Sequence, residues 1–268
     1  MHHPLRHPLT RLTPLLLLLL LWATAASSAA AVPEPNDDSL FLRRVYTNHA
    51  GVQLPYRLAL PHPLDTKPSY PLVVFLHGAA ARGNDNQAPL EWGPRLIYTN
   101  SQTSRQPCIL VVPQCPKGAG WVGGSDKGID ALSQTVELVR DVLSKDLKID
   151  SHRRYLTGVS MGGIGLWSFM SQYPGFFAAG VPVCAAGSPS AVTRAAARFP
   201  MWAFHSDDDH LIPVQSARDM VKAWRDQGGV ARYTEYTGLK HSSWKKAYLE
   251  PELIPWLFQQ ATPKSSQP

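Results

Sequence analysis

Three polar groups that lie far apart in the chain have the types and the order that acyl-transfer chemistry requires. Ser160 is the centre of Gly158-Val159-Ser160-Met161-Gly162, a G-x-S-x-G pattern; three aspartates follow at 207–209, and His241 comes later. A serine hydroxyl is a weak nucleophile at neutral pH, so it needs a base, and the base needs an orienting carboxylate. The order serine, acid, histidine suits a nucleophile on a strand-to-helix turn. The pattern predicts nucleophilic attack on an acyl carbon.

The acid and the base are chosen by their place after strand-like segments. We expect Asp209 to be the acid, because D-x-x-I-P then leads into a helix that Pro213 opens. Asp208 is the alternative, while the first two aspartates otherwise face solvent or cap backbone N–H groups. His241, in a loop after the last strand-like run, is the expected base. Three other histidines compete for the role and are more often structural: His77, His205 and His210.

Attack on a carbonyl places negative charge on its oxygen, and preorganised N–H donors must stabilise that charge. One expected donor is the backbone amide of Met161, directly after the nucleophile at a helix start. The second is expected in the loop that follows "VVFLHG". Ala79 is the predicted donor there, with Gly78 adjacent.

The segments around these residues alternate between strand-like and helix-like patterns. An antiparallel pair is expected over 43–48 and 51–61, and the buried runs that predict strands are 70–78, 108–116, 153–158, 176–185, 200–206 and 231–238. Helical spacing appears over 128–147, after 160, over 213–224 and over 251–260. This alternation predicts an α/β fold with a mostly parallel central sheet, an antiparallel N-terminal edge and helices on both faces. No separate lid domain is expected.

The first residues have the pattern of a targeting segment. Arg6 and Arg11 precede the leucine run 15–21, and small residues follow, which predicts a signal peptide over 1–31 cleaved near Ala31. A membrane anchor is the alternative, but the apolar run is shorter than the roughly 20 residues that span a bilayer. We therefore expect a secreted or periplasmic protein without a stable membrane anchor. The mature chain divides into a flexible segment over 32–39, one domain over 40–260 and a flexible tail over 261–268.

Charge and cysteine content narrow the classes of partner. The net charge is +6, but the basic residues are scattered, so no nucleic-acid partner is expected. No metal-ligand spacing occurs, and the predicted chemistry needs no cofactor. Three cysteines leave at least one thiol free. Cys108 and Cys184 have the context of small buried hydrophobes, and a disulfide, if one forms, is expected to involve Cys115.

These residues together resemble the α/β-hydrolase superfamily, and within it the single-domain carboxylesterase branch related to dienelactone hydrolases and prolyl-oligopeptidase-like hydrolases. That branch includes feruloyl and acetyl-xylan esterases and a phospholipase/carboxylesterase group. The resemblance depends on "PLVVFLHGAAARGNDN", "ILVVPQCP", "GVSMGGIGLW", "WAFHSDDDHLIPV" and "GLKHSSWKKAY". It implies the same triad, Ser160, Asp209 and His241, and the same backbone donors. One departure is Ser206, where the family commonly has glycine, which leaves the geometry of the acid loop open.

The expected function is a secreted serine hydrolase that cleaves carboxylic esters through an acyl-enzyme. Its substrate is expected to be a small-molecule or polysaccharide-linked ester, such as an acylated plant polysaccharide. Trp121 and Trp244 are candidate substrate-binding residues, with simple packing as the alternative. Two other functions stay open: a prolyl-oligopeptidase-like serine peptidase, and a non-catalytic binding protein with the hydrolase fold.

Overall fold

The computed structural model describes Met1 and residues 38–62, 67–123 and 130–263. The chain divides into two compact units, Met1–Ala31 and Val32–Pro268, and the description below concerns the second. Apart from Met1, the expected signal peptide lies outside the described residues, as do 32–37 and 264–268.

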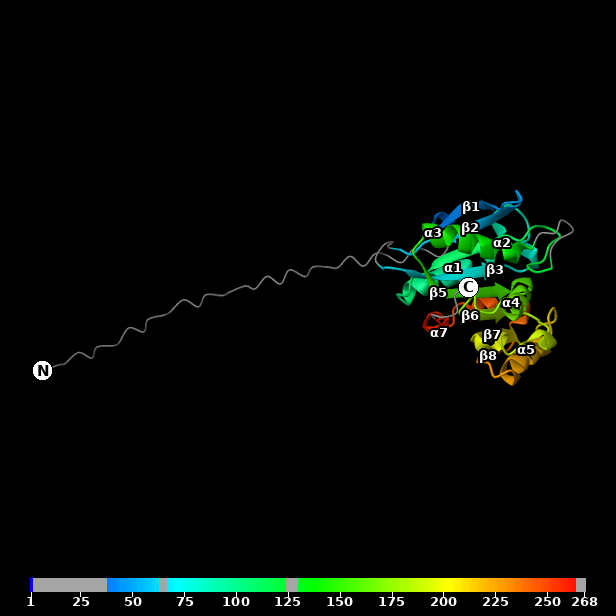
Figure 1. Cartoon of the computed structure of the whole chain (residues 1–268). Coiled ribbons are helices and arrows are strands. Elements are labelled where there is room, and N and C mark those ends of the chain that lie inside the picture. The colour runs from blue at the N-terminus through cyan, green and yellow to red at the C-terminus, as the bar shows by residue number, and fades with distance from the viewer. Residues whose placement is uncertain (2–37, 63–66, 124–129, 264–268) are drawn as a thin grey trace. The chain divides into compact units, whose positions relative to one another are not determined.

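Eight strands form one sheet in the order β1-β2-β4-β3-β5-β6-β7-β8 (Figure 1). β2 pairs antiparallel with both β1 and β4, while every pair from β4 to β8 is parallel. This confirms the predicted mostly parallel sheet with an antiparallel N-terminal edge. The strands are β1 Phe41–Thr47, β2 Gln53–Ala59, β3 Tyr70–Leu76, β4 Ile109–Pro113, β5 Ile149–Val159, β6 Ala179–Val183, β7 Met201–Ser206 and β8 Ala231–Tyr236.

Helices connect the parallel strands and cover both faces of the sheet. They are α1 Pro94–Thr103, α2 Ala131–Glu137, a π-helical stretch Leu138–Leu143, α3 Ser144–Asp146, α4 Met161–Gln172, α5 Val214–Asp226, α6 Trp244–Ala247 and α7 Leu253–Gln259. The buried large apolar side chains of α2, α4 and α5 belong to one hydrophobic cluster, and those of α1, α6 and α7 to a second. Among the described helices, none has the length and apolar character needed to cross a bilayer.

The alternation of side chains along β3 explains why its sequence is apolar throughout. Leu72, Val74 and Leu76 point into the first cluster, while Val73 and Phe75 point into the second. Because both faces of a parallel sheet are covered by helices, both sets must be apolar. Full burial of each such side chain contributes about 1.5–3 kcal/mol to stability.

The parallel pairing brings four strand ends to one edge of the sheet. Val159 at the end of β5 pairs with Val183 at the end of β6, and Val183 pairs with Phe204 in β7. Ser206 at the end of β7 pairs with Tyr236 at the end of β8. The segments that follow these four strands therefore meet at the same edge, although they are far apart in the sequence.

Candidate active site

Ser160 occupies the strained turn between β5 and α4. Its backbone has φ 54° and ψ −117°, a region that non-glycine residues rarely adopt and that costs about 1–3 kcal/mol. The glycines on either side make the turn possible, because a Cβ on Gly162 would lie 2.0 Å from the carbonyl oxygen of Leu76 and one on Gly158 would lie 2.4 Å from Gly162. The amide of Ser160 donates to Val183 O at 2.9 Å. The half-buried side chain is thus held at the end of the strand.

His241 and Asp209 are joined at the same edge of the sheet. The Nδ1 atom of His241 lies 2.7 Å from Oδ2 of Asp209, whose side chain is fully buried. The other carboxylate oxygen accepts the amides of Leu211 and Ile212, at 2.9 and 3.0 Å. Because Oδ2 can only accept, the imidazole carries its proton on Nδ1 and leaves Nε2 able to accept another. A histidine base in this state is what serine activation requires.

The other two aspartates fasten the loop instead of reaching His241. Asp208 Oδ1 accepts the hydroxyl of Ser206 at 2.6 Å and the amide of Lys240 at 2.9 Å, and these bonds lower the pKa of the carboxyl. Asp207 accepts the hydroxyl of Thr237 at 3.0 Å. Ser206 also accepts the amide of Leu239 at 3.1 Å. The residue that departs from the family pattern therefore ties the acid loop to the loop that bears the histidine.

A second histidine, His205, lies behind the acid. Its buried Nε2 is 2.9 Å from Ile212 O and 3.3 Å from Asp209 Oδ2, and burial lowers its pKa. A neutral ring with its proton on Nε2 donates toward both oxygens. His205 thus supports the acid loop, as expected of a structural histidine. His210 is exposed.

The loop after β3 lies against the nucleophile turn. A Cβ built on Gly78 would lie 3.6 Å from the Cβ of Ser160, and Ala79 begins a short 3₁₀ turn, Ala79–Ala81. Met161 is the first residue of α4. Within the described residues, neither the Ala79 nor the Met161 amide donates to another backbone carbonyl. The N–H groups of the two predicted oxyanion donors are therefore uncommitted to the backbone, and their role stays a prediction.

His77 fixes the start of that loop. Its Nε2 accepts the amide of Cys115 at 2.9 Å, so Nδ1 carries the proton and donates to Gly78 O at 2.7 Å. Trp121 Nε1 donates to the carbonyl of His77 at 2.9 Å. Burial lowers the pKa of His77 to about 4, so the ring is neutral near pH 7. His77 thereby links the start of this loop to the segments that bear Cys115 and Trp121.

Cys184 directly follows β6, and its amide donates to the carbonyl of Phe204 in β7 at 2.8 Å. Burial raises the pKa of its thiol to about 12. In the part of the chain that the structure describes, no hydrogen bond joins Ser160 to His241, so the step between nucleophile and base belongs to the proposal below.

Comparison with known proteins agrees with this fold. A solved structure described as a thermostable esterase is 35% identical to the chain, with a TM-score of 0.75; the match covers 83% of this chain and 64% of the esterase. The chain has the α/β-hydrolase fold. A ferulic acid esterase of Anaeromyces mucronatus superposes with a TM-score of 0.61 over 80% of the chain, at 14% identity, which shows the shared fold alone.

Among curated proteins, the chain matches a bifunctional acetylxylan esterase/xylanase of Neocallimastix patriciarum. The two are 28% identical over 167 residues, which is 62% of this chain and 23% of the relative. The chain therefore spans less than two thirds of both the thermostable esterase and the fungal protein. No family model matches the sequence.

The two tryptophans named as substrate-binding candidates are packed in the α/β-hydrolase core. Trp121 is 1% exposed, and its ring meets His77 edge-on with centroids 4.9 Å apart. Trp244 is 9% exposed and belongs to the cluster that holds α7. It borders a hollow of about 330 Å³ whose lining includes neither Ser160 nor His241. This burial favours the packing alternative for both side chains.

The remaining candidates for chemistry are the cysteines and metal-binding groups. Cys108, Cys115 and Cys184 are all buried free thiols, and burial raises the pKa of each to about 12. The Cys115 disulfide that the sequence left open is therefore not formed. Over the described ranges, no three histidine, cysteine, aspartate or glutamate side chains gather as metal ligands.

Proposed function

We propose that this chain is a serine esterase that hydrolyses carboxylic esters through an acyl-enzyme. The observation that carries the proposal is the buried Asp209–His241 bond of 2.7 Å at the sheet edge where Ser160 holds its strained turn. Strain at a half-buried serine on a strand-to-helix turn, at the sheet edge that also carries an oriented imidazole, is characteristic of a nucleophile site. The thermostable esterase and the acetylxylan esterase among the compared proteins support the same reaction class.

In the proposed reaction, Ser160 Oγ attacks the acyl carbon while His241 Nε2 takes the hydroxyl proton. The tetrahedral oxyanion accepts hydrogen bonds from the amides of Ala79 and Met161, each worth about 3 kcal/mol of barrier. His241 then gives its proton to the departing alkoxide, which leaves as an alcohol. Water next attacks the acyl-enzyme with His241 as base, and the acid is released with Ser160 regenerated. Asp209 stabilises the transient imidazolium.

The proposed substrate is an ester borne by a plant polysaccharide, and the proposed location is outside the cytoplasm. The curated relative is named as an acetylxylan esterase, which supports this substrate class. The targeting pattern over 1–31 supports export, which is where such a polymer is met. Peptidase activity has weaker support, because the acylaminoacyl peptidases that superpose are 14–15% identical and share the fold alone.

Ser160→Ala tests the proposal, with Ser190→Ala at an exposed serine as the matched control. We expect the first variant to lose at least about 10³-fold in kcat on p-nitrophenyl acetate, since the nucleophile is gone. The control is expected to keep full activity. A fluorophosphonate probe is expected to label the parent protein at Ser160, as read by peptide mass spectrometry. Absence of both hydrolysis and labelling in the folded parent protein would favour a non-catalytic binding protein.

A further inference from the structure

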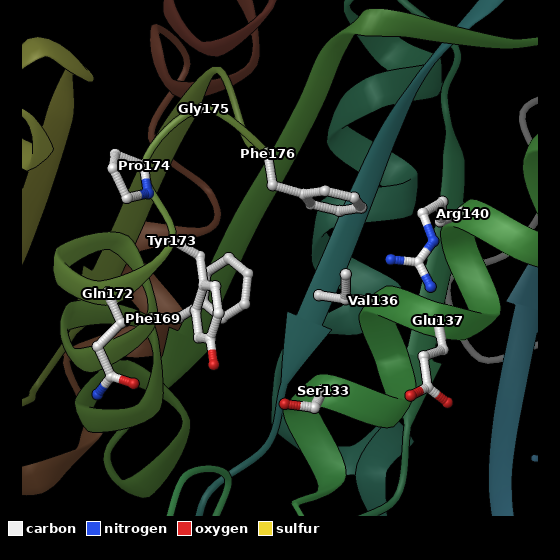
Figure 2. A pocket seen from close by; sticks show the side chains of 10 residues that line it. All are labelled: Ser133, Val136, Glu137, Arg140, Phe169, Gln172, Tyr173, Pro174, Gly175 and Phe176. Atoms are coloured by element: carbon white, nitrogen blue, oxygen red, sulfur yellow. The ribbon is translucent and has the colours of Figure 1, made fainter. Parts of the chain in front are cut away.

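A hollow of about 660 Å³ lies between the end of α4 and α2 with the π-helical stretch (Figure 2). The ring of Phe176 extends across it toward Val136 and Arg140. Among the described residues, its lining includes no member of the candidate triad. The groups that can affect the proposed chemistry lie elsewhere, in the two loops that bear the acid and the base.

The position of His241 depends on a short irregular loop. Between β8, which ends at Tyr236, and α6, which begins at Trp244, the chain forms a single 3₁₀ turn over Lys240–Ser242. The backbone of Lys240 has φ 51°, a left-handed conformation that residues with a Cβ rarely adopt. Such a conformation persists only where the surrounding structure holds it. The contacts of the backbone just before His241 therefore decide where its imidazole lies.

Two side chains from the acid loop bind this backbone. Ser206, fully buried at the end of β7, accepts the amide of Leu239 at 3.1 Å on its Oγ atom. The same hydroxyl donates to Asp208 Oδ1 at 2.6 Å. That carboxylate oxygen also accepts the amide of Lys240 at 2.9 Å. The Ser206–Asp208 pair thus binds the amides of both residues that precede His241.

The hydroxyl of Ser206 is well matched to this arrangement. It has one proton and two acceptors within reach, Asp208 Oδ1 at 2.6 Å and Tyr236 O at 3.3 Å. The carboxylate is both the nearer and the charged acceptor, so it receives the stronger bond. The lone pairs of Oγ stay available to the Leu239 amide. An alanine at position 206 would remove every one of these bonds.

Ser206 also connects the base to the acid. Its backbone carbonyl accepts the amide of Asp209 at 3.3 Å, while its side chain accepts the amide of Leu239. Asp209 binds the imidazole of His241 directly, at 2.7 Å. One residue at the end of β7 therefore contacts both the segment that bears the acid and the segment that bears the base.

We propose that Ser206, through its bond to Asp208, is a positioning residue that holds the imidazole of His241 where it can take the proton of Ser160. The proposal rests on the esterase function proposed above. Among the described residues, the Ser206 side chain makes no hydrogen bond to a triad side chain, so its effect passes through the backbone of the histidine loop. Its loss lowers kcat and leaves KM nearly unchanged, because orientation of the base matters only in the transition state.

The test compares Ser206→Ala, Asp208→Ala and the double variant with the parent protein on p-nitrophenyl acetate. We expect kcat to fall about ten-fold in each single variant, with KM within about two-fold of the parent value. The double variant is expected to lose no more than about the larger single loss, because the two side chains act as one unit.

Thr237→Val is the matched control. The hydroxyl of Thr237 donates to Asp207 at 3.0 Å, a bond that joins the same two loops at an exposed position without touching the amides before His241. We expect its kcat to stay within about two-fold of the parent value, because an exposed hydrogen bond contributes little net free energy.

A second readout does not depend on turnover. The proton between His241 Nδ1 and Asp209 Oδ2 is expected to give a proton NMR resonance in the parent protein, identified by its absence in His241→Gln. We expect this resonance to broaden in Ser206→Ala at the same pH, because a less firmly held imidazole exchanges the proton with water faster. If Ser206→Ala does not fold, Asp208→Ala, at a half-exposed side chain, gives the same comparison.

The outcomes separate this proposal from the one on which it rests. Parent values of kcat in both single variants, with the resonance unchanged, would overturn the positioning role and leave the esterase function standing. An equal loss in Thr237→Val would also overturn it, because any weakening of the two loops would then have the same effect. Failure of the folded parent protein to hydrolyse the ester would reject the esterase function, whereas broadening of the resonance in Ser206→Ala would still support the hold on His241.

Discussion

At the scale of single residues, Asp209 and Asp208 have different hydrogen-bond partners, so substituting each in turn tests which of them is the acid of the proposed triad. In Asp209, two backbone amides bind Oδ1, while His241 and His205 face Oδ2. In Asp209→Asn the side-chain oxygen must stay where the amides are, so its NH₂ group faces His241. The imidazole then accepts at Nδ1 and carries its proton on Nε2, which prevents it from acting as a base. We expect kcat to fall about 10³- to 10⁴-fold.

The control for this prediction is Asp208→Asn. Its Oδ1 accepts from Ser206 and Lys240, and an amide oxygen can accept both bonds in the same way. We expect its kcat on p-nitrophenyl acetate to stay within about three-fold of the parent value. Equal losses in the two variants would contradict the choice of Asp209 as the acid.

At the scale of elements, the anchored loop after β3 makes stability depend on pH. Burial lowers the pKa of His77 in the folded protein from 6.5 to about 4. Between pH 4 and pH 6.5 the unfolded chain therefore binds a proton at His77 that the folded protein does not bind. The contribution of His77 to the free energy of unfolding is therefore fully present above about pH 6.5 and is lost as the pH falls toward 4. The full loss is roughly 3 kcal/mol, from 1.36 kcal/mol per pKa unit. Urea unfolding at pH 7 and pH 4.5 measures it.

His77→Gln removes the titrating group while keeping an oxygen that can accept the amide of Cys115. We expect this variant to be less stable than the parent at pH 7 and to lose less stability between pH 7 and pH 4.5. His49→Gln, at an exposed turn, is the matched control and is expected to show the parent pH dependence. Parallel pH curves for the parent and His77→Gln would contradict the assigned state of the ring.

The elements that the sequence predicts are those whose burial forces a simple pattern. β3 and β4 are covered on both faces and are apolar throughout, so their strands were predictable. α5 alternates buried and exposed positions at helical spacing and was also predictable. α1 was not, because its apolar side chains, Leu96 to Tyr98, lie in a single turn and give no period. β5 begins at Ile149, before the predicted 153, because its first residues lie half-buried in a polar segment.

Within the candidate site, the order of strands and helices along the chain predicted where the residues lie, whereas the types of the side chains did not predict their contacts. The strand ends that carry Ser160, Asp209 and His241 follow from the alternation of strands and helices. The contacts of Ser206, by contrast, depend on where the loop after β8 folds back, and no local pattern encodes that. The same holds for Trp121, which is buried and donates to the carbonyl of His77, 44 positions earlier in the chain.

At the scale of the whole molecule, stability comes from two apolar layers and not from covalent links. A chain of this length buries roughly 70% or more of its surface on folding, so it does not need the disulfides that small exported domains use. The three cysteines take part in these layers as small apolar groups: Cys115 lies in one cluster, and Cys108 and Cys184 lie in the other. Their pKa values of about 12 keep the thiols protonated at neutral pH.

Buried, protonated thiols are expected to be inert even in an oxidising compartment, because the thiolate is the reactive form. We therefore expect Ellman's reagent to detect no thiol in the native protein and three per chain in guanidinium chloride. Addition of dithiothreitol is expected to leave the melting temperature unchanged, since there is no cross-link to reduce. A fall of several degrees, or fewer than three thiols after unfolding without reductant, would show that a disulfide contributes to stability. Detection of no thiol in the native protein would mean that this protein tolerates export because its thiols lie out of reach of oxidants.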